Sequence, residues 1–292
     1  MSRRLIAGAG SKIRLYDFLR TEMGLTKKQI SRLKYTEGGI LVNGEEVYVT
    51  QMLNPGDIVD ADAGSVPAEG HAIAPSAEPL AVLYEDDDII VLNKPAGVPT
   101  HPAGIHQEDT IVNRLVYYFR ENGEPVIPHP VGRLDISTSG VLCFAKNRTA
   151  LARLNKQRER KLLYKEYTAA VPGHLENKSG EIELPLRRDP ENALRVIVSE
   201  DGKYAKTVYD VIRETGDISF VRLRLLTGRM HQIRVHMASL GHPLLGDRLY
   251  GGNTDRIDRA ALHAGKMVLY KPFSEEKLEL TAPVPEDMLK LL

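Results

Sequence analysis

An arginine and an aspartate lie two residues apart in the polar segment HPVGRLDISTSGVLCFAKN, residues 129–147. After Arg133 and Asp135 the segment becomes apolar and typical of a strand, so both side chains are expected in a loop that leads into a sheet. Such loops commonly carry reactive side chains, although an isolated aspartate in a loop is more often a turn former or a helix cap. Asp135 is therefore a candidate catalytic carboxylate that needs support from another segment.

A second polar segment, TGRMHQIRVHMASLGHPLLGD, covers residues 227–247 and contains a predicted helix start. The groups crowded at that start are Arg229, His231, Gln232 and Arg234. His231 and Arg234 lie three residues apart and share a helical face. A cationic helix start opposite an acidic loop favours a salt-bridged carboxylate, so these four residues are candidates for holding the substrate and the catalytic group.

A carboxylate of this kind can act as a nucleophile or as a base. An aspartate has an unperturbed pKa of ~3.9 and is ionised at neutral pH, and a neighbouring arginine keeps it ionised even in a dry pocket. Glycosidases also use carboxylate catalysis, but they normally need two catalytic carboxylates, and only Asp135 stands in a motif of this kind. A glycoside hydrolase is therefore possible for this chain but is not the favoured function.

Other catalytic motifs are weak. His231, His236, His242 and His263 lack the compact spacing of metal ligands, and Cys143 is the single cysteine, so we expect no metal site. The sequence has no GxSxG nucleophile elbow and no GxxxxGK(S/T) or GxGxxG phosphate loop. We therefore expect a reaction without a cofactor.

The composition is that of a folded chain. Of its 292 residues, 42% are hydrophobic, which suffices for a sizeable core. No apolar run approaches the ~20 residues that span a bilayer, and the N-terminus lacks the apolar stretch of a signal peptide. The single cysteine excludes an internal disulfide and fits a reducing compartment. We expect a soluble, cytoplasmic monomer that does not bind membranes.

Charge is unevenly distributed along a chain whose formal net charge is zero. Residues 1–34 contain nine Lys or Arg and two acids, whereas residues 35–90 contain twelve Asp or Glu and no Lys or Arg. Residues 146–165 contain eight basic residues and one acid. A single charged run is usually a solvated face, but two separate basic segments favour an anionic polymer as the partner.

The first 62 residues predict a small α/β unit. RLYDFLRTEM places Leu15, Phe18 and Leu19 on one helical face. Thr26 and Gln29 fit a capping box for a second helix. The basic residues that this second helix offers are Lys27, Lys28, Arg32 and Lys34.

A hairpin and a further strand follow in this unit. Asn43 and Gly44 lie between apolar runs, which is a strong hairpin signal, and LNPGDIVDA adds a turn and a strand. This series resembles the small RNA-binding domain of the S-four type, which is shared with a ribosomal small-subunit protein. The resemblance covers residues 12–62 and implies that the basic helix binds RNA. The alternative is a generic α/β cap on the larger domain.

Residues 63–79 are rich in Ala, Pro, Gly and Ser, and we interpret them as a linker to a second domain at residues 80–292. In that domain LAVLYEDDDIIVLNKPAG predicts two strands, and DTIVNRLVYYFREN predicts a helix capped by Asp109. Seven further strands follow, with one helix at MHQIRVHMASLG that ends at Gly241. Many strands with few helices predict an α+β domain on a largely antiparallel, mixed sheet.

Five segments of the larger domain occur in the order found in one enzyme family. They are NKPAGVPTHP, VGRLDISTSGVLCFAKN, KEYTAAVPG, TGRMHQIRVHMASLGHPLLGD and LHAGKMVLYKP. In these motifs the chain resembles the RluA-type RNA pseudouridine synthases, which isomerise uridine to pseudouridine in structured RNA. The match runs from about residue 80 to residue 285, and five separated motifs in one order are very specific.

The resemblance implies a role for each matching residue. Asp135 corresponds to the essential aspartate of the family, and Tyr167, in KEYTAA, to the tyrosine beside the target base. Arg234, in HQIR, corresponds to the arginine that pairs with the aspartate. Arg133 corresponds to an arginine that fills the space left by the flipped nucleotide. The motif that lines the pocket contains Leu262 and His263.

One position departs from the family pattern. Many members have His before the Arg-Leu-Asp run, whereas this chain has Gly132, which offers no side chain to RNA. The resemblance points first to large-subunit ribosomal RNA and second to transfer RNA as the substrate. It leaves open whether Asp135 attacks the ribose, attacks the base or acts as a base. A non-catalytic RNA-binding or ribosome-assembly factor is the alternative, against which the intact set of Asp135, Tyr167 and Arg234 argues.

Overall fold

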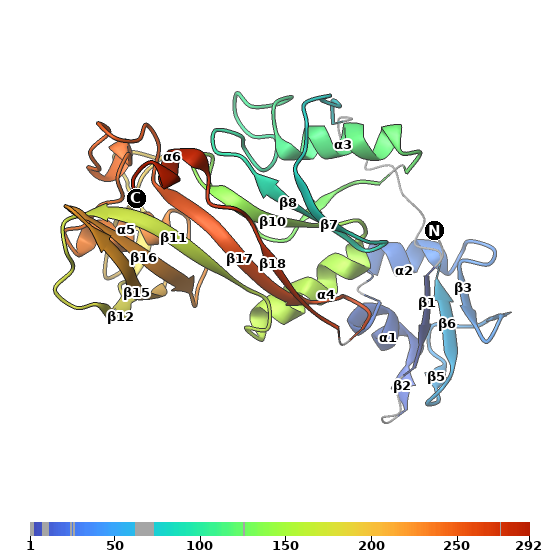
Figure 1. Cartoon of the computed structure of the whole chain (residues 1–292). Helices are drawn as coiled ribbons and strands as arrows, with labels where there is room; N and C mark the ends of the chain where they lie inside the picture. Colours follow the sequence, from blue (N-terminus) through green and yellow to red (C-terminus); the bar gives the residue numbers. More distant parts are fainter. Residues whose placement is uncertain are drawn as a thin grey trace.

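The computed structural model describes residues 3–7, 12–23, 25, 27–61, 73–124, 126–274 and 276–292. A small N-terminal unit lies at one end, and a ten-stranded sheet with helices packed on it makes up the rest (Figure 1). The fold class is α+β with a mostly antiparallel, mixed sheet, which confirms the sequence-based prediction.

The N-terminal unit has its own sheet and its own core. The sheet runs in the order β1 (Arg3–Ile6), β6 (Ile58–Ala61), β3 (Ile40–Val42) and β4 (Glu45–Glu46). Beside it, β2 (Ile13–Arg14) pairs with β5 (Met52–Leu53), and the two helices are α1 (Leu15–Thr21) and α2 (Lys27–Leu33). The core is a separate apolar cluster drawn from these elements.

The local signals in this unit behave as the sequence predicts. Leu15, Phe18 and Leu19 are buried in the core of the unit. Asn43 and Gly44 both have positive φ angles and join β3 to β4 in a two-residue turn, which confirms the hairpin. Thr26 lies outside the described residues, and with it the expected capping box.

The large sheet has one parallel pairing, between β10 and β17, at its centre. Its order is β12 (Ser179–Glu183), β15 (Lys206–Thr215), β16 (Ile218–Leu225), β11 (Tyr164–Pro172), β17 (Leu262–Tyr270), β10 (Ser139–Ala145), β8 (Ile89–Lys94) and β7 (Val82–Glu85). In addition, β18 (Lys277–Thr281) pairs with β17, and β9 (His129–Pro130) with β10. A separate hairpin consists of β13 (Leu186–Arg188) and β14 (Val196–Val198).

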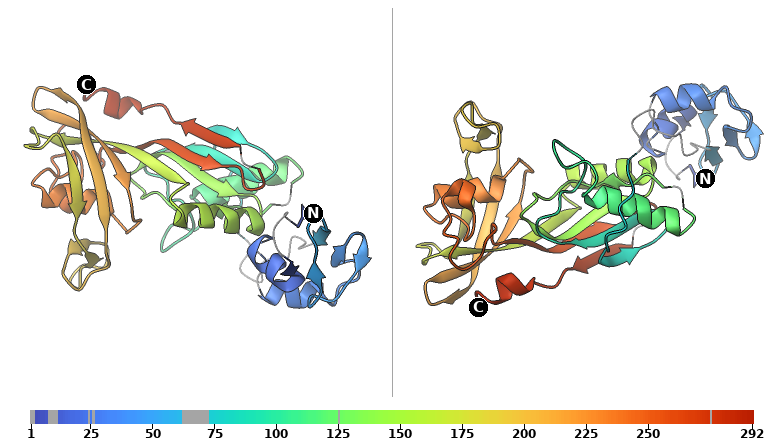
Figure 2. Two further views of the ribbon diagram at one scale, coloured as in Figure 1. Left: turned by 90° about the horizontal axis from the view of Figure 1, so that it is seen from below. Right: turned by 90° about the horizontal axis from the view of Figure 1, so that it is seen from above.

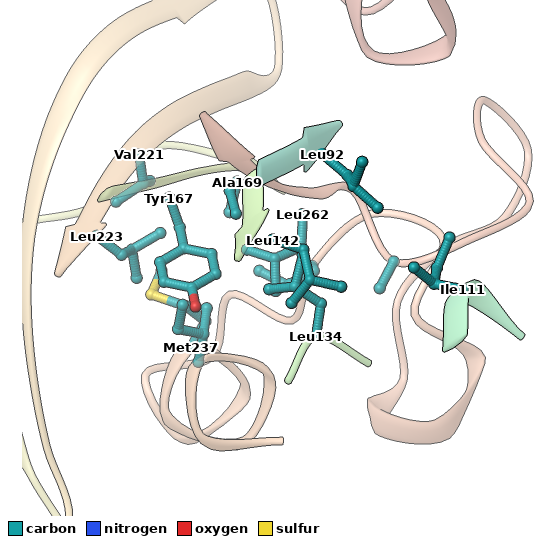
Figure 3. Packing of buried hydrophobic residues seen from close by; sticks show 14 of the residues in the cluster. Leu92, Ile111, Leu134, Leu142, Tyr167, Ala169, Val221, Leu223, Met237 and Leu262 are labelled. Atoms are coloured by element: carbon teal, nitrogen blue, oxygen red, sulfur yellow. The ribbon is translucent and has the colours of Figure 1, made fainter. Parts of the chain in front are cut away.

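The helices of the larger part cover this sheet. They are α3 (Ile111–Glu121), α4 (Arg148–Glu159), α5 (Gln232–Ser239), the short 3₁₀ helix η1 (Arg248–Tyr250) and α6 (Glu286–Leu289). The main apolar cluster includes Leu134 before β10, Leu142 on β10, Tyr167 on β11 and Met237 on α5 (Figure 3). Residues that flank the predicted catalytic loop therefore belong to the core that holds the sheet and helices together.

The N-terminus of α3 differs in detail from the prediction. Its cap is Thr110 and not Asp109, because the Thr110 side chain accepts from the backbone of Asn113 while the Asn113 side chain accepts from the backbone of Thr110. Asp109 instead pairs with His106, at 2.5 Å between Oδ2 and Nδ1. Neighbouring Asp and Thr residues both favour a cap position, and the reciprocal bond with Asn113 selects Thr110.

Helix α4 occupies most of the second basic segment, residues 146–165. Its sequence is mostly polar, so its buried apolar face is hard to recognise from the sequence. Ala150 and Leu154 are buried against the sheet. On its outer side, Arg153 donates from Nε to the carbonyl oxygen of Glu22 at 2.8 Å, and Lys156 donates to that of Thr21. The N-terminal unit therefore contacts α4 through the end of α1, and both views of Figure 2 show this unit at one end of the larger part.

The predicted linker is only partly described. Residues 62–72 lie outside the described ranges, whereas residues 73–79 form neither helix nor strand. Asn113 of α3 donates to the carbonyl oxygen of Ala74 at 2.7 Å and holds this stretch in place. Among the described residues, no helix is both long and apolar enough to cross a bilayer.

Candidate active site

Residues 131–138 connect β9 to β10 and carry Asp135, the predicted catalytic residue, and we call them the catalytic loop. The loop that follows β8 fixes their position. Thr100 Oγ1 donates to the carbonyl oxygen of Leu134 at 3.0 Å. The carbonyl oxygen of Ile136 accepts from the Gly97 N–H at 2.8 Å and from Lys94 Nζ at 3.2 Å. Residues 93–100, NKPAGVPT, therefore hold the residues on both sides of Asp135 by donating hydrogen bonds to the backbone carbonyl oxygens of the catalytic loop.

Two glycines shape this loop. Gly132 has φ +79°, a left-handed conformation that side chains rarely adopt, and this accounts for glycine at the departing position. A Cβ atom there would lie 3.5 Å from Nη1 of Arg158. An arginine of α4 therefore lies next to the place that a side chain at position 132 would occupy. A Cβ atom on Gly140 would lie 2.2 Å from the carbonyl oxygen of Ala264. Only glycine lets β10 approach β17 this closely.

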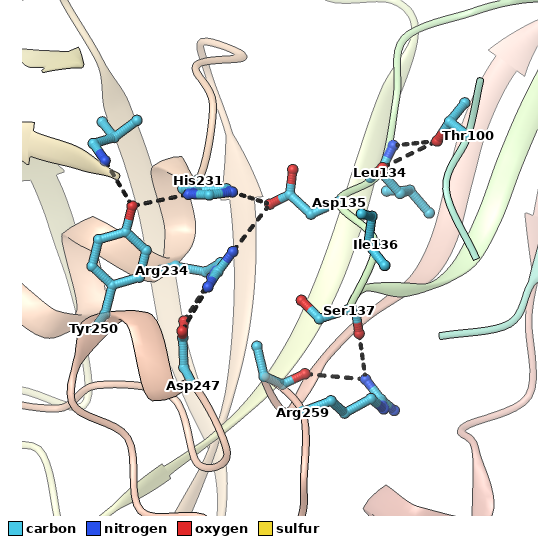
Figure 4. Close-up of polar contacts among 12 residues, drawn as sticks. Thr100, Leu134, Asp135, Ile136, Ser137, His231, Arg234, Asp247, Tyr250 and Arg259 are labelled. Carbon is cyan, nitrogen blue, oxygen red and sulfur yellow. Dashed lines mark hydrogen bonds and ion pairs between the residues drawn. The ribbon is translucent and has the colours of Figure 1, made fainter. Parts of the chain in front are cut away.

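Asp135 points from the catalytic loop toward the start of α5 (Figure 4). Its Oδ2 lies 3.9 Å from Nε2 of His231 and 4.0 Å from Nη1 of Arg234. The Asp135 side chain is 19% exposed, so it can reach a bound molecule while most of its surface is shielded from water. The structure thus brings the carboxylate together with two of the four polar residues predicted at the helix start.

Arg234 has a second and closer partner beside the expected Asp135. Arg234 makes a bidentate ion pair with Asp247, in which Nε–Oδ2 and Nη2–Oδ1 are both 2.6 Å, and its contact with Asp135 is much longer. Burial alone would lower the pKa of Arg234, but the hydrogen bonds and charges of Asp247 and then Asp135 raise it above its ordinary value. Arg234 is therefore a permanent cation that Asp247 fixes and that Asp135 shares.

His231 stands at the N-cap of α5 in a strained conformation. Its φ of +52° and ψ of +19° are left-handed, which costs on the order of 1–3 kcal/mol and tends to occur at functional sites. Its Nδ1 lies 2.9 Å from the Tyr250 hydroxyl, which accepts from the Val196 N–H at 3.0 Å. Because this oxygen already accepts one hydrogen bond, we assign the hydroxyl proton to Nδ1, and this assignment places the proton of the neutral ring on Nε2, facing Asp135.

Electrostatics keep this imidazole neutral. Burial lowers the pKa of His231, and Asp135, which favours the charged form, offsets only part of that effect. Arg234 lowers the pKa further by charge repulsion. A neutral His231 can offer a polar N–H to the carboxylate without pairing its charge.

Tyr167 lies on β11 at a break in the strand register. Glu166 pairs with Lys266, but Tyr167 pairs with Ala264, so β17 has an extra residue there. Such bulges re-aim side chains near functional sites. The ring lies beside Leu223 and Met237 in the main apolar cluster (Figure 3), and Tyr167 is 7% exposed. Burial and then the charge of Asp135 raise the pKa of Tyr167, so its hydroxyl keeps its proton at neutral pH.

Three predicted substrate contacts are core residues instead. Gln232 is 2% exposed, and its amide bonds only to protein groups, among them the Lys206 carbonyl oxygen at 3.0 Å and the Arg229 N–H at 3.0 Å. His263 is 1% exposed, with Nδ1 2.9 Å from Ser139 Oγ and Nε2 3.2 Å from the Ala282 carbonyl oxygen. Leu262 is buried in the main cluster. In the structure these three enclosed side chains lie beneath the site and not on its surface.

The remaining predicted contacts lie on the surface. Arg133 is exposed and close enough to lower the pKa of His231 by its charge. Arg229 is exposed and donates from Nε to the Tyr204 carbonyl oxygen at 2.9 Å. Lys27, Arg32 and Lys34 are exposed on or just after α2, in the N-terminal unit and not around Asp135. Lys28 also belongs to α2, and its side chain lies outside what the structure describes.

Two residues of the site were missed in the sequence. Asp247 and Tyr250 lie in PLLGDRLYGG, directly after the predicted helix. An aspartate after glycine reads as a turn former, so the pattern does not set it apart. The available signal was the cationic helix start, which carries more positive charge than one carboxylate can balance. In the ranges that the structure describes, His, Cys, Asp and Glu form no group of three or more that could hold a metal ion.

Comparisons with known proteins show the family of the chain. A protein-family model described as RNA pseudouridylate synthase matches residues 88–239, which contain both the catalytic loop and α5. The chain is 40% identical over 279 residues to YhcT of Bacillus subtilis strain 168, an uncharacterised RNA pseudouridine synthase, covering 95% of this chain and 91% of that protein.

Two further relatives have more informative names. Ribosomal large subunit pseudouridine synthase D of Escherichia coli K12 is 37% identical over 232 residues, which cover 75% of this chain and 71% of that protein. The solved structure of human RNA pseudouridylate synthase domain containing 1 has a TM-score of 0.60 and 30% identity, covering 71% of this chain and 84% of that chain.

Proposed function

The chain belongs to the RNA pseudouridylate synthase family, whose members are isomerases acting on RNA, and we propose that Asp135 is its catalytic carboxylate. The observation that carries the proposal is the place of this side chain. Asp135 stands on a loop held by backbone hydrogen bonds on both sides, faces a fixed cation and a neutral imidazole, and remains 19% exposed.

The reaction requires one group that can bond reversibly or take a proton. The bond between N1 of uracil and C1′ of ribose breaks, and a bond between C5 and C1′ forms. C5 loses its hydrogen as a proton, and N1 gains one. Atoms and electrons balance within the nucleotide, so the isomerisation needs no oxidant, reductant or group donor, and we propose that it needs no cofactor. Asp135 can attack C1′ or the base, or remove a proton.

The neighbours of Asp135 suit this work. Because Arg234 is held by Asp247, the oxygens of Asp135 are not locked in a bidentate pair and stay available for the substrate. The nearby positive charge stabilises the carboxylate when it leaves again. His231 presents its N–H to the same oxygen and limits how the carboxylate can rotate.

Tyr167 offers a ring face and a protonated hydroxyl at the same site. Its raised pKa makes it a poor base before substrate binds, so we propose that it stacks on the uracil and donates a hydrogen bond. The ring is held by Leu223 and Met237, which keeps its orientation fixed while the base rotates.

The target base must leave its stack to reach Asp135, which costs a few kcal/mol. We propose that exposed Arg133, next to the catalytic loop, occupies the vacated place and offsets part of that cost. Arg158 beside Gly132 supplies a second cation at this point. The exposed basic residues at the end of α4, Arg158 and Arg160, and those of the N-terminal unit, which we propose is an RNA-binding domain, would hold flanking phosphates.

Large-subunit ribosomal RNA is the proposed substrate. It rests on the relatives named for that subunit, which match the chain at 37% identity. The test is to map pseudouridines in ribosomal and transfer RNA from cells with and without this protein. One or more sites in large-subunit RNA should disappear and return when the purified protein is added. Sites lost only from transfer RNA would move the substrate to that class, and no lost site would contradict the proposal.

A further inference from the structure

Arg259 reaches from the segment before β17 to the catalytic loop. Its Nη1 donates to the carbonyl oxygen of Ser137 at 3.0 Å, two residues after Asp135 (Figure 4). The same nitrogen lies 3.1 Å from the carbonyl oxygen of Ala260 and 3.2 Å from that of Leu262. One guanidinium nitrogen thus joins the catalytic loop to the first residue of β17.

Asp287 on α6 holds the other edge of this guanidinium. Nε lies 2.6 Å from Oδ2 and Nη2 lies 2.9 Å from Oδ1, so the pair is bidentate. With that edge occupied, the orientation of Arg259 is fixed and Nη1 faces the three carbonyl oxygens. The hydrogen bonds from Arg259 lower the pKa of Asp287, so the carboxylate stays ionised at neutral pH.

Packing holds Asp287 in place. Met288, the next residue, is fully buried and lies in a cluster with Leu245, Ile257 and Leu291. Glu286, the preceding residue, is exposed and pairs with Lys290 at 2.9 Å on the surface. Of these two adjacent acids, one therefore reaches inward to the catalytic loop and the other does not.

We infer that Arg259 and Asp287 are positioning residues that fix the position of Asp135 from the side of β17 and α6. The inference rests on the proposed function of Asp135. Leu134 and Ile136 are held from the side of the β8 loop. Ser137 is held by Arg259, on the side of β17 and α6. Without that bond the loop loses its only described side-chain tie on this side, and Asp135 can shift relative to α5.

The chemistry of the pair selects arginine and a carboxylate. A lysine at position 259 would keep the charge but lose the planar fork that binds Asp287 on one edge and carbonyl oxygens on the other. An asparagine at position 287 keeps the volume but loses the charge and one acceptor. A shift of about 1 Å in a catalytic group can lower a rate about 100-fold, so we expect Asp287→Asn to slow the reaction by about 10- to 100-fold.

The experiment measures single-turnover conversion with enzyme in excess over the mapped RNA. Uridine labelled with tritium at C5 releases its label when the new bond forms. The variants are Asp287→Asn and Arg259→Lys, with Glu286→Gln as the matched control on the same helix. The quantities are the maximal rate constant, the enzyme concentration at half saturation, the fraction of RNA converted and the melting temperature.

Positioning predicts a lower rate constant in both variants, with unchanged half saturation and a Glu286→Gln control that matches the wild type. The double variant should be no slower than the slower single variant, because both changes break one linkage. A rate constant equal to that of the control would overturn the inference, even if the melting temperature or the converted fraction fell.

Asp135→Asn is measured beside them. If it keeps its activity, the proposed function fails, whatever the other variants do. If it is inactive while Asp287→Asn and Arg259→Lys react at the wild-type rate, only the positioning role fails.

Discussion

Arg234 and Asp247 form a bidentate ion pair with both nitrogen–oxygen distances at 2.6 Å, while Asp135 meets the same guanidinium at 4.0 Å (Figure 4). Structural pairing and catalysis are thus divided between two carboxylates. Asp247, which is 1% exposed, fixes the cation, and Asp135, at 19%, keeps its oxygens free for the substrate.

This division predicts a large loss of stability in Asp247→Asn. The change removes the bidentate charged partner of the buried Arg234 and leaves only the 4.0 Å contact with Asp135, and breaking a buried pair typically costs about 3–5 kcal/mol in the free energy of unfolding. Chemical denaturation measures it. The control is Asp217→Asn, which breaks a bidentate pair with Arg256 whose side chains are 72% and 51% exposed, and should cost about 1 kcal/mol or less. Equal losses in the two variants would show that the inner pair is not a structural anchor.

The protein should lose stability as the pH falls below neutrality. Burial lowers the pKa of His231, His236 and His263 below the ordinary value of 6.5. Between that value and the lower folded-state values, the unfolded chain binds more protons, so the free energy of unfolding rises with pH. The stability is fully present above pH 6.5 and is lost below it, by up to about 1.4 kcal/mol per pH unit for each histidine.

Denaturation at pH 7.5, 6.5 and 5.5 measures this slope. His236→Gln is the informative variant, because His236 lies between Thr207 and the Leu184 carbonyl oxygen, away from Asp135. This variant should take up fewer protons on unfolding, by up to one, and the free energy of unfolding should depend less steeply on pH. A protein that becomes more stable on acidification over this range would contradict the assignment of neutral buried imidazoles.

Arg158 provides a test of RNA binding next to the catalytic loop. Arg158→Ala should weaken binding at low salt and reduce the steepness of its salt dependence by about one phosphate contact. The melting temperature should not change, because the side chain is exposed. Arg256→Ala, an exposed arginine that pairs with Asp217, is the control. If both variants bind RNA as tightly as the wild type, Arg158 does not contact phosphate.

The N-terminal unit should contribute affinity but not chemistry. Removal of residues 1–70 is expected to weaken RNA binding and to flatten its salt dependence, because exposed Lys27, Arg32 and Lys34 are lost with it. The active site should remain, since its residues lie outside this unit. Affinity and single-turnover rate at saturating enzyme separate the two effects. Unchanged affinity would show that the unit is not a docking module.

The sequence predicts those parts of the fold that local pattern controls. The strand after Asp135, the buried face of α1 and the turn at Asn43 and Gly44 follow from periodicity and turn chemistry. Asp135 lies near His231 and Arg234, as the two polar sequence motifs predict.

What local pattern does not contain is the choice among competing partners. Arg234 has two carboxylates within reach, and only the packed structure shows that Asp247 holds it. His263 lies in a motif that suggests contact with RNA, yet β17 is buried on both faces at this point and His263 bonds to Ser139. The bond between Arg259 and Ser137 joins residues 122 positions apart, and no single-sequence pattern records such a contact.

The most direct test of the central claim is the rate of pseudouridine formation by Asp135→Asn on the mapped RNA. The substitution keeps the size of the side chain, removes its negative charge and replaces one acceptor oxygen with an amide donor. We expect Asp135→Asn to have the melting temperature and the RNA affinity of the wild type and to form no pseudouridine. Formation of pseudouridine at the wild-type rate by this variant would contradict it.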